Sequence, residues 1–201
     1  TVNGFNALKI LSSNPSKPFD TGRDGLNLGE AAAYLVLESE EVATGKQFLV
    51  KITGYGNAND AHHPSAMSDE AVGAIASMKA ALASAGLQTS DIDYVNAHGT
   101  GTPNNDQVEL EGLKLLFGNV PVYNSTKPYT GHTLGAAGAV EAIFSILSLQ
   151  YQTVFPQLNI QFPIDPVYAP KSTLLNTELK NILSNSFGFG GNCTSLVISK
   201  S

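Results

Sequence analysis

The sequence has 201 residues, 42% hydrophobic and 14% charged, which is long enough for one sizeable buried core. Its formal net charge of −6, without a basic stripe, argues against a nucleic-acid-binding protein. No apolar run approaches the roughly 18 residues that span a bilayer, and no signal-peptide pattern opens the sequence. Cys193 is the single cysteine, so an intrachain disulfide is excluded and a reducing cytoplasm is expected.

The first part of the sequence alternates between helix and strand patterns. Residues 1–12 predict an amphipathic helix with no earlier partner, and the sequence opens without methionine, so we expect a piece of a longer protein. The continuous apolar run 31–39 is typical of a strand buried on both faces. A second strand is expected at 48–60, where it ends in turn residues. Residues 68–86 predict a helix with a serine at its start and a glycine at its end.

The second part continues the alternation and completes an α/β layered pattern. The predicted elements are a strand at 92–99, a helix at 104–118, a strand at 120–126, a helix at 134–150, and strands at 181–187 and 193–200. The helix at 134–150 is so apolar that we expect it to be buried nearly all round. Residues 151–170 are expected to be mainly loop. Functional groups of a parallel sheet gather at the carboxyl ends of its strands, which places His98 and Ser125 there.

Two segments combine histidine with an unusual backbone. His98 begins HGTGTP, in which Thr100 and Thr102 face the same way if the stretch is extended. A turn with a hydrogen-bonded histidine is an equally good interpretation of this motif alone. His132 lies in TGHTLGAAGA, just before a helix whose first N–H groups lack partners. The small residues there allow a ligand or another backbone to approach closely.

Lys127 and Glu141 flank the second histidine within the same apolar segment. An unpaired buried carboxylate is very costly, so Lys127 is expected to pair with Glu141. This ion pair can be purely structural even if the neighbouring histidine is catalytic.

The remaining polar features are weaker signals. The glycine-rich NSFGFGGN can offer backbone N–H groups to an oxyanion, or can be a tight β-turn. A metal site is not expected, because His98 and His132 lack the short spacing of zinc ligands and Cys193 lies on an expected core strand. His62 and His63 are expected in a loop.

Four segments together resemble the carboxyl-terminal half of a β-ketoacyl-acyl carrier protein synthase, the condensing enzyme of fatty acid synthesis. They follow one another in the family's order: KPFDTGRDGLNLGEAAAYLVLE (17–38), YVNAHGTGTPNND (94–106), NSTKPYTGHTLGAAGAVEA (124–142) and NSFGFGGN (185–192). The resemblance implies one thiolase-like α/β half-domain over residues 1–201. Its expected architecture is a five-stranded mixed sheet with helices on both faces.

The resemblance also implies roles for individual residues. His98 and His132 match the two histidines that hydrogen-bond the malonyl thioester carbonyl and stabilise the enolate formed as carbon dioxide leaves. Lys127 and Glu141 match the pair that sets the field around the second histidine and orients it.

Further matches concern the substrate arm and the gate. Thr100 and Thr102 match residues that hydrogen-bond the pantetheine arm. Phe189 matches a gating phenylalanine whose backbone N–H contributes to the oxyanion hole.

Other expectations follow for the whole protein. The family's nucleophilic cysteine belongs to the amino-terminal half, and Cys193 does not match it, so we expect this chain alone to be inactive in condensation. The implied partners are acyl carrier protein, the missing amino-terminal half, and a second copy in a homodimer. No cofactor is implied beyond the phosphopantetheine that carries the substrates. An exposed internal apolar face should make the isolated chain associate or be marginally stable.

Some positions depart from the family pattern. Ala32 replaces a common glycine, Asn104 and Asn105 replace a leucine–glycine pair, and Asn192 and Cys193 replace threonine–asparagine. These departures leave the acyl chain length and the pathway open. Two other functions stay open as well, namely a thiolase and a non-catalytic subunit resembling a chain-length factor. The two histidines and the lysine argue against the latter.

Overall fold

One five-stranded sheet forms the centre of the protein. The structure is a computed structural model that describes residues 1–165 and 169–201. The strands are Val50–Asn59 (β1), Tyr94–Asn96 (β2), Val122–Asn124 (β3), Asn181–Gly188 (β6) and Asn192–Lys200 (β7), in the order β1-β7-β6-β2-β3. β2 pairs parallel with β3 and β6, whereas β7 pairs antiparallel with β6 and β1. The predicted mixed sheet is therefore confirmed.

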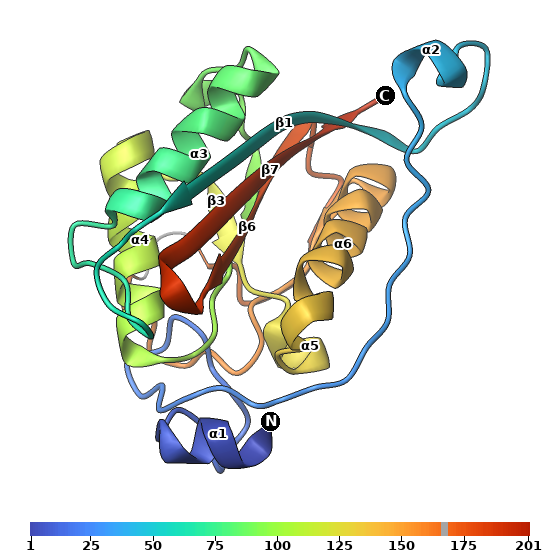
Figure 1. Cartoon of the computed structure of the whole chain (residues 1–201). Coiled ribbons are helices and arrows are strands. Elements are labelled where there is room, and N and C mark those ends of the chain that lie inside the picture. The colour runs from blue at the N-terminus through green and yellow to red at the C-terminus, as the bar shows by residue number, and fades with distance from the viewer. Residues whose placement is uncertain (166–168) are drawn as a thin grey trace.

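Helices cover both faces of this sheet (Figure 1). α3 (Val72–Ala85) and α4 (Pro103–Phe117) lie on one face, and α6 (Ala137–Tyr151) lies on the other. The remaining elements are short: α1 (Val2–Ala7), α2 (Glu40–Ala43), α5 (Lys127–Thr130), β4 (Thr153–Val154), β5 (Leu174–Leu175) and the 3-10 turns Thr89–Asp91, Leu134–Ala136 and Phe189–Gly191. The three-layer arrangement confirms the predicted α/β class.

Each face of the sheet has its own apolar core. Met78, Leu113 and Leu183 are fully buried in the core under α3 and α4, and Ile182 lies in the core under α6. α3 approaches β1 very closely, since a Cβ atom at Gly56 would lie 2.0 Å from the Ser77 carbonyl oxygen. Glycine is therefore required at this position of the strand.

Most predicted elements are confirmed with small shifts at their ends. Gly86 ends α3 in a left-handed conformation, with a φ of 69°, and Gly118 ends α4. α3 starts at Val72 rather than near Ser68, because Ser68 hydrogen-bonds to the Asp60 carboxylate in the preceding turn. β6 and β7 form the expected antiparallel hairpin around the glycine-rich turn.

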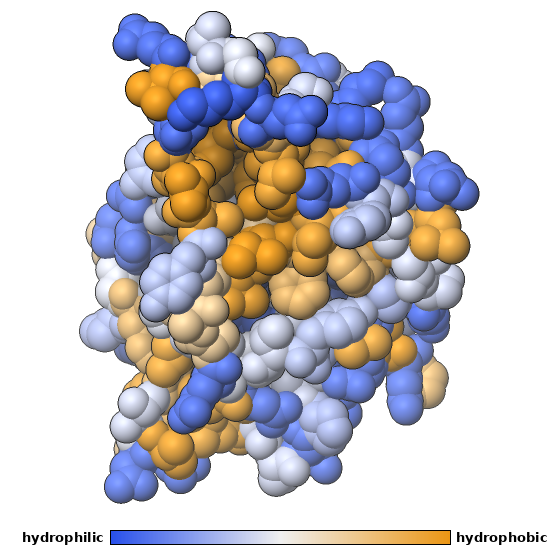
Figure 2. Space-filling view, turned by 90° about the vertical axis from the view of Figure 1, so that its right-hand side faces the viewer, coloured by the Kyte–Doolittle hydropathy of each residue, from blue (hydrophilic) through white to orange (hydrophobic). Residues whose placement is uncertain are grey.

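α6 differs from the expectation that it is buried nearly all round. Only 33% of the 18-residue stretch Leu134–Tyr151 is buried, and its mean hydropathy of 1.3 gives it the length and composition of a membrane-crossing helix. The expectation that no apolar run reaches this length was therefore wrong. One side of α6 packs on β6 and β7, as in a core helix. Figure 2 shows a broad apolar area on the surface that carries α6.

Residues 31–39 form no strand, so this prediction was also wrong. The segment runs as an extended strap beside α6 and leads to α2 (Figure 1), and the side chains of Tyr34 and Val36 are 90% and 92% exposed. Its apolar sequence suits a buried strand. Within the described residues, however, the five-stranded sheet ends at β1 and β3, and the strap pairs with neither edge strand.

Candidate active site

The carboxyl ends of the parallel strands β2 and β3 bring the candidate residues together. His98 lies two residues after β2, and Lys127 begins α5 three residues after β3. His132 follows α5, where its backbone N–H donates to the Asn27 carbonyl at 2.7 Å. A Cβ at Gly29 would lie 2.0 Å from the Thr130 carbonyl oxygen, so the absence of a side chain lets the two loops meet.

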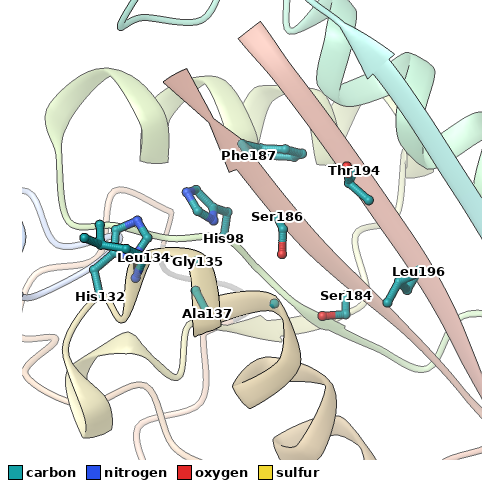
Figure 3. Close-up of a pocket in the computed structure, with 11 residues that line it drawn as sticks. His98, His132, Leu134, Gly135, Ala137, Ser184, Ser186, Phe187, Thr194 and Leu196 are labelled. Atoms are coloured by element: carbon teal, nitrogen blue, oxygen red, sulfur yellow. Dashed lines mark hydrogen bonds between the residues drawn. The ribbon is translucent and has the colours of Figure 1, made fainter. Parts of the chain in front are cut away.

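The two imidazoles converge, although they are 34 residues apart in sequence. Their ring centroids lie 5.5 Å apart, with an angle of 82° between the ring planes. Both line a cavity of about 310 Å³ between the start of α6 and the hairpin of β6 and β7 (Figure 3). Small residues form one wall, namely Gly135 in the 3-10 turn Leu134–Ala136 and Ala137 and Gly138 at the start of α6, and Phe187 forms part of another. The cavity can therefore present two ring nitrogens to a single small group.

A buried ion pair supports the first of these histidines. Lys127 and Glu141 have side chains that are each 3% exposed, and Lys127 Nζ donates to Glu141 Oε1. The same ammonium donates to the His98 carbonyl oxygen and lies 3.3 Å from His98 Nδ1. The predicted pairing is confirmed. The Lys127 side chain reaches back under the end of β2 and makes its direct contact with His98. Its charge also acts on His132, the histidine whose field the pair was expected to set.

Hydrogen bonds to the Nδ1 atoms define the tautomers of both histidines. An ammonium only donates, so Lys127 Nζ requires His98 Nδ1 to be an acceptor. His132 Nδ1 accepts from the Leu134 backbone N–H at 3.2 Å. Neutral rings bonded in this way carry their proton on Nε2. The site thus contains two Nε2–H donors in one small region.

Burial keeps both histidines neutral. Desolvation lowers the pKa of His98 well below its ordinary value, and the charge of Lys127 and the adjacent His132 lower it further. Burial and the Lys127 charge lower the pKa of His132 to about 3. Burial raises the pKa of Glu141, and the Lys127 charge opposes that rise. At neutral pH the imidazoles are therefore hydrogen-bond donors without charge.

Glu109 is a site residue that the sequence reasoning missed. Its carboxylate, buried inside α4, accepts the backbone N–H groups of His98 and Gly99, both at 2.8 Å, and the Asn185 side-chain N–H at 3.1 Å. Burial raises its pKa to about 7. The available signal was an acid among apolar residues of a helix, the same signal that identified Glu141. Glu109 fixes the backbone path that aims His98 at the cavity.

The expected substrate-binding residues lie in the loop after His98. The hydroxyls of Thr100 and Thr102 are 2.9 Å apart and therefore face the same way. The stretch is not extended as the alternation argument required, because Gly101 between them has a φ of 83°. The Asp106 carboxylate holds this loop, because it accepts the backbone N–H of Gly101 at 3.1 Å and that of Phe19 at 2.9 Å. The loop thus has a defined path beside the cavity.

Phe189 takes a more peripheral position than the other candidates. Its side chain is 53% exposed, and its ring stacks on that of Phe5 with 5.9 Å between centroids. The aromatic ring that lines the cavity is that of Phe187, whose centroid lies 5.6 Å from that of His98. Phe189 starts the short turn Phe189–Gly191 between β6 and β7. It therefore adjoins the site through the backbone of the hairpin.

The other candidates lie outside this cluster. Cys193 is fully buried on β7, and burial raises its thiol pKa to about 12, as suits a core residue. His62 and His63 lie in an exposed loop, as expected. Residues 1–165 and 169–201 contain no group of three His, Cys, Asp or Glu side chains arranged to hold a metal ion.

Comparisons with known proteins agree with this geometry. Residues 49–161 match the family described as beta-ketoacyl synthase, C-terminal domain. A mitochondrial 3-oxoacyl-[acyl-carrier-protein] synthase of Arabidopsis thaliana is 41% identical over 98% of this chain and 46% of its own length. The 3-oxoacyl-[acyl-carrier-protein] synthase 2 of Vibrio harveyi is 40% identical over 98% of this chain and 51% of its own. The chain thus spans about half the length of these curated relatives.

Solved structures show the same relation. A beta-ketoacyl synthase from Burkholderia phymatum superimposes with a TM-score of 0.89 and 36% identity, covering all of this chain and 51% of that one. A type II polyketide ketosynthase solved with its acyl-carrier protein gives a TM-score of 0.93 and 31% identity, over 100% and 52%. The fold is that of the thiolase-like condensing enzymes. Within that class, the chain belongs to the beta-ketoacyl synthase family.

Proposed function

We propose that this chain supplies the decarboxylating half of the active site of a 3-oxoacyl-[acyl-carrier-protein] synthase. The reaction is a decarboxylative Claisen condensation of malonyl-acyl carrier protein with an acyl thioester. The observation that carries the proposal is the pair of Nε2–H donors, from His98 and His132, at one cavity. The family membership supports it and argues against the thiolase alternative.

The proposed step uses both donors at one oxygen. The bond between the malonyl α-carbon and its carboxylate breaks, and carbon dioxide leaves. The electron pair moves toward the thioester oxygen and forms an enolate, whose charge His98 and His132 stabilise by hydrogen bonding. The enolate carbon then attacks the carbonyl carbon of the acyl thioester. The new C–C bond replaces the C–S bond of that thioester, and the sulfur that carried the acyl group leaves as a thiolate. Neutral imidazoles suit this role because they hold their protons while charge develops, and the low pKa of His132 supports it.

The other proposed roles belong to the protein as a whole. Thr100 and Thr102 hydrogen-bond the pantetheine arm of acyl carrier protein, which brings the substrates, so no further cofactor is needed. The backbone N–H of Phe189 contributes to an oxyanion hole. A complementary amino-terminal half provides the nucleophilic cysteine, because Cys193 is buried and poorly acidic. The complete protein is proposed to be a cytoplasmic homodimer.

The proposal is tested by measuring carbon dioxide release from malonyl-acyl carrier protein with the full-length protein. His98→Ala and His132→Ala are each expected to lower the release rate by about 10²–10³-fold, the usual cost of losing one donor to a developing oxyanion. Lys180→Met, in an exposed pair with Glu178, is the control and should leave the rate unchanged. Release at the wild-type rate in both histidine variants would refute the assignment.

A non-catalytic partner subunit is the second candidate, since one structural neighbour is a ketosynthase/chain length factor. The neutral, oriented histidines and the Lys127–Glu141 pair favour the catalytic role. In the same experiment, a full-length wild-type protein that releases no carbon dioxide unless a separate ketosynthase is added supports the partner role.

A further inference from the structure

The turn that carries Phe189 is attached to a second segment, residues 59–67, which begins at the last residue of β1. Three hydrogen bonds join them. Gly190 N–H donates to the Pro64 carbonyl at 2.8 Å, Asp60 N–H donates to the Gly191 carbonyl at 2.8 Å, and the Asn59 side-chain N–H donates to the Gly190 carbonyl at 2.9 Å. The 59–67 segment therefore holds the turn Phe189–Gly191 in place together with the ladder of β6 and β7.

The fit between the two segments is also close. A Cβ atom at Gly191 would lie 3.0 Å from the Ala61 backbone nitrogen and 3.1 Å from Asn59 Oδ1, and its φ of 78° is in the left-handed region. The Phe189 ring stacks on the ring of Phe5. A displacement of the 59–67 segment would therefore move the turn with it.

The 59–67 segment is itself held at both ends. At its start, the Asp60 carboxylate accepts the Gly73 N–H at 2.8 Å and the Ser68 hydroxyl at 2.8 Å. At its end, the side-chain amide of Asn104 bonds to both backbone groups of Met67. Asn104 Oδ1 accepts the Met67 N–H at 3.1 Å, and Asn104 Nδ2 donates to the Met67 carbonyl at 3.4 Å.

Asn104 is placed to connect the two loops of the site. It is the second residue of α4, and Thr102 is the residue directly before this helix. Its side chain does not cap the helix, since the start of α4 has no side-chain capping hydrogen bond. Its amide oxygen and nitrogen hydrogen-bond to the backbone of Met67 instead. The neighbouring Asn105 is directed elsewhere, toward the Asp106 carboxylate at 3.1 Å. A residue with an aliphatic side chain at position 104 would break both bonds.

We infer that Asn104 is a positioning residue for Phe189. It ties the loop of His98, Thr100 and Thr102 to the 59–67 segment, and that segment holds the turn Phe189–Gly191. The catalytic consequence rests on the proposed function, in which the backbone N–H of Phe189 contributes to an oxyanion hole. Loss of the Asn104 amide is expected to loosen the turn without altering the His98–His132 pair, because Glu109 and Lys127 hold His98 independently.

The test is amide hydrogen exchange of the full-length protein, followed by mass spectrometry of peptides. In Asn104→Ala, amides in a peptide over residues 186–193 are expected to exchange at least tenfold faster. Amides of β2 serve as the internal reference and should be unchanged. Asn59→Ala, which removes a direct bond to the turn, should give the same pattern. Gln107→Ala, an exposed amide one turn further along α4, is the matched control and should exchange as wild type.

A folding defect is kept separate from the inferred effect. If Asn104→Ala fails to fold, Asn104→Asp takes its place, since it retains an acceptor for the Met67 N–H and should give an intermediate rise in exchange. Unchanged exchange of the 186–193 peptide in a folded Asn104 variant would overturn the inference. So would a rise of equal size in Gln107→Ala.

An activity measurement completes the test. In Asn104→Ala, kcat for condensation is expected to fall at least threefold while KM for malonyl-acyl carrier protein changes less than twofold. Exchange does not depend on activity, so a wild-type protein without condensation activity would refute the proposed function while leaving the exchange result decisive for Asn104. Faster exchange combined with unchanged kcat and KM would restrict Asn104 to a structural role and refute the inferred effect on catalysis.

Discussion

The histidine cluster, which comprises His98, His132, Lys127, Glu141 and Glu109, differs from the apolar surface of α6 and the strap 31–39 in what it buries. In the cluster, strongly polar groups are buried and each has specific partners: Lys127 with Glu141, and Glu109 with two backbone N–H groups. On the surface of α6 and the strap 31–39, apolar groups are exposed and Tyr34 and Val36 contact little protein. Within the described residues, the buried charges of the cluster have partners, whereas the apolar side chains of Tyr34 and Val36 are exposed.

This difference separates the geometry of the site, which contacts inside the chain define, from the apolar surface, which has the character of an interface. Hydrogen bonds among nearby segments suffice to place His98 and His132, so the geometry of the donors belongs to this half alone. An exposed apolar area of this kind marks an interaction surface. The strap has the composition of a strand and no neighbour in the described sheet. Three experiments probe how distinct the two regions are.

The largest effect is expected from breaking the ion pair inside the cluster. Lys127→Met leaves Glu141 buried without its partner, which typically costs about 3–5 kcal/mol of unfolding free energy. Urea denaturation measures this loss. Lys127→Met combined with Glu141→Met removes both charges at similar volume and should recover most of it. Lys180→Met, in an exposed pair, should leave the urea midpoint unchanged. A wild-type midpoint in the single Lys127 variant would contradict the description of the cluster.

The pH dependence of stability gives the next effect. The folded-state pKa of His132, about 3, lies below its unfolded value, so the unfolded chain binds more protons as pH falls through about 6.5 and stability is lost. Glu109 acts in the opposite direction, because its raised pKa favours proton uptake by the folded state between pH 7 and its unfolded value near 4.5. Comparing wild type with His132→Asn cancels the contribution of Glu109 and the other common groups.

Between pH 6.5 and 4.5, wild type is expected to lose about 2 kcal/mol more unfolding free energy than His132→Asn. Urea titrations at the two pH values measure the difference. Equal losses in both proteins would show that His132 titrates normally and is not desolvated.

The smallest effect concerns the apolar surface. The isolated chain is expected to self-associate, and Tyr34→Lys with Val36→Lys should weaken association at least tenfold, or about 1.4 kcal/mol. Sedimentation equilibrium measures it. Leu115→Lys is the matched control, since Leu115 is an exposed apolar residue of α4 on the other side of the sheet. A stable wild-type monomer, or equal weakening by Leu115→Lys, would contradict the view that this surface is incomplete.

The sequence allowed the polar site to be predicted better than the apolar surface. Periodicity and terminal glycines located α3 and α4, and the cost of an unpaired acid identified the partner of Glu141. The same rule applies to Glu109, whose partners are backbone groups that no sequence pattern indicates. The strand prediction for residues 31–39 was wrong because an apolar run predicts burial but does not indicate which sheet would bury it. The neighbour of Lys127 depends on the path of its side chain, which spacing alone does not define.

The contact between Glu109 and the main chain of His98 has a practical consequence. The Glu109 carboxylate accepts the backbone N–H of His98 rather than an N–H of the ring, so the loop should keep its shape when the imidazole is replaced. The side chain of His98 can therefore be changed without changing the backbone that carries it. Under the proposed function, a full-length His98→Ala protein should therefore still bind a malonyl thioester and react with it slowly, which would provide a long-lived complex for crystallography.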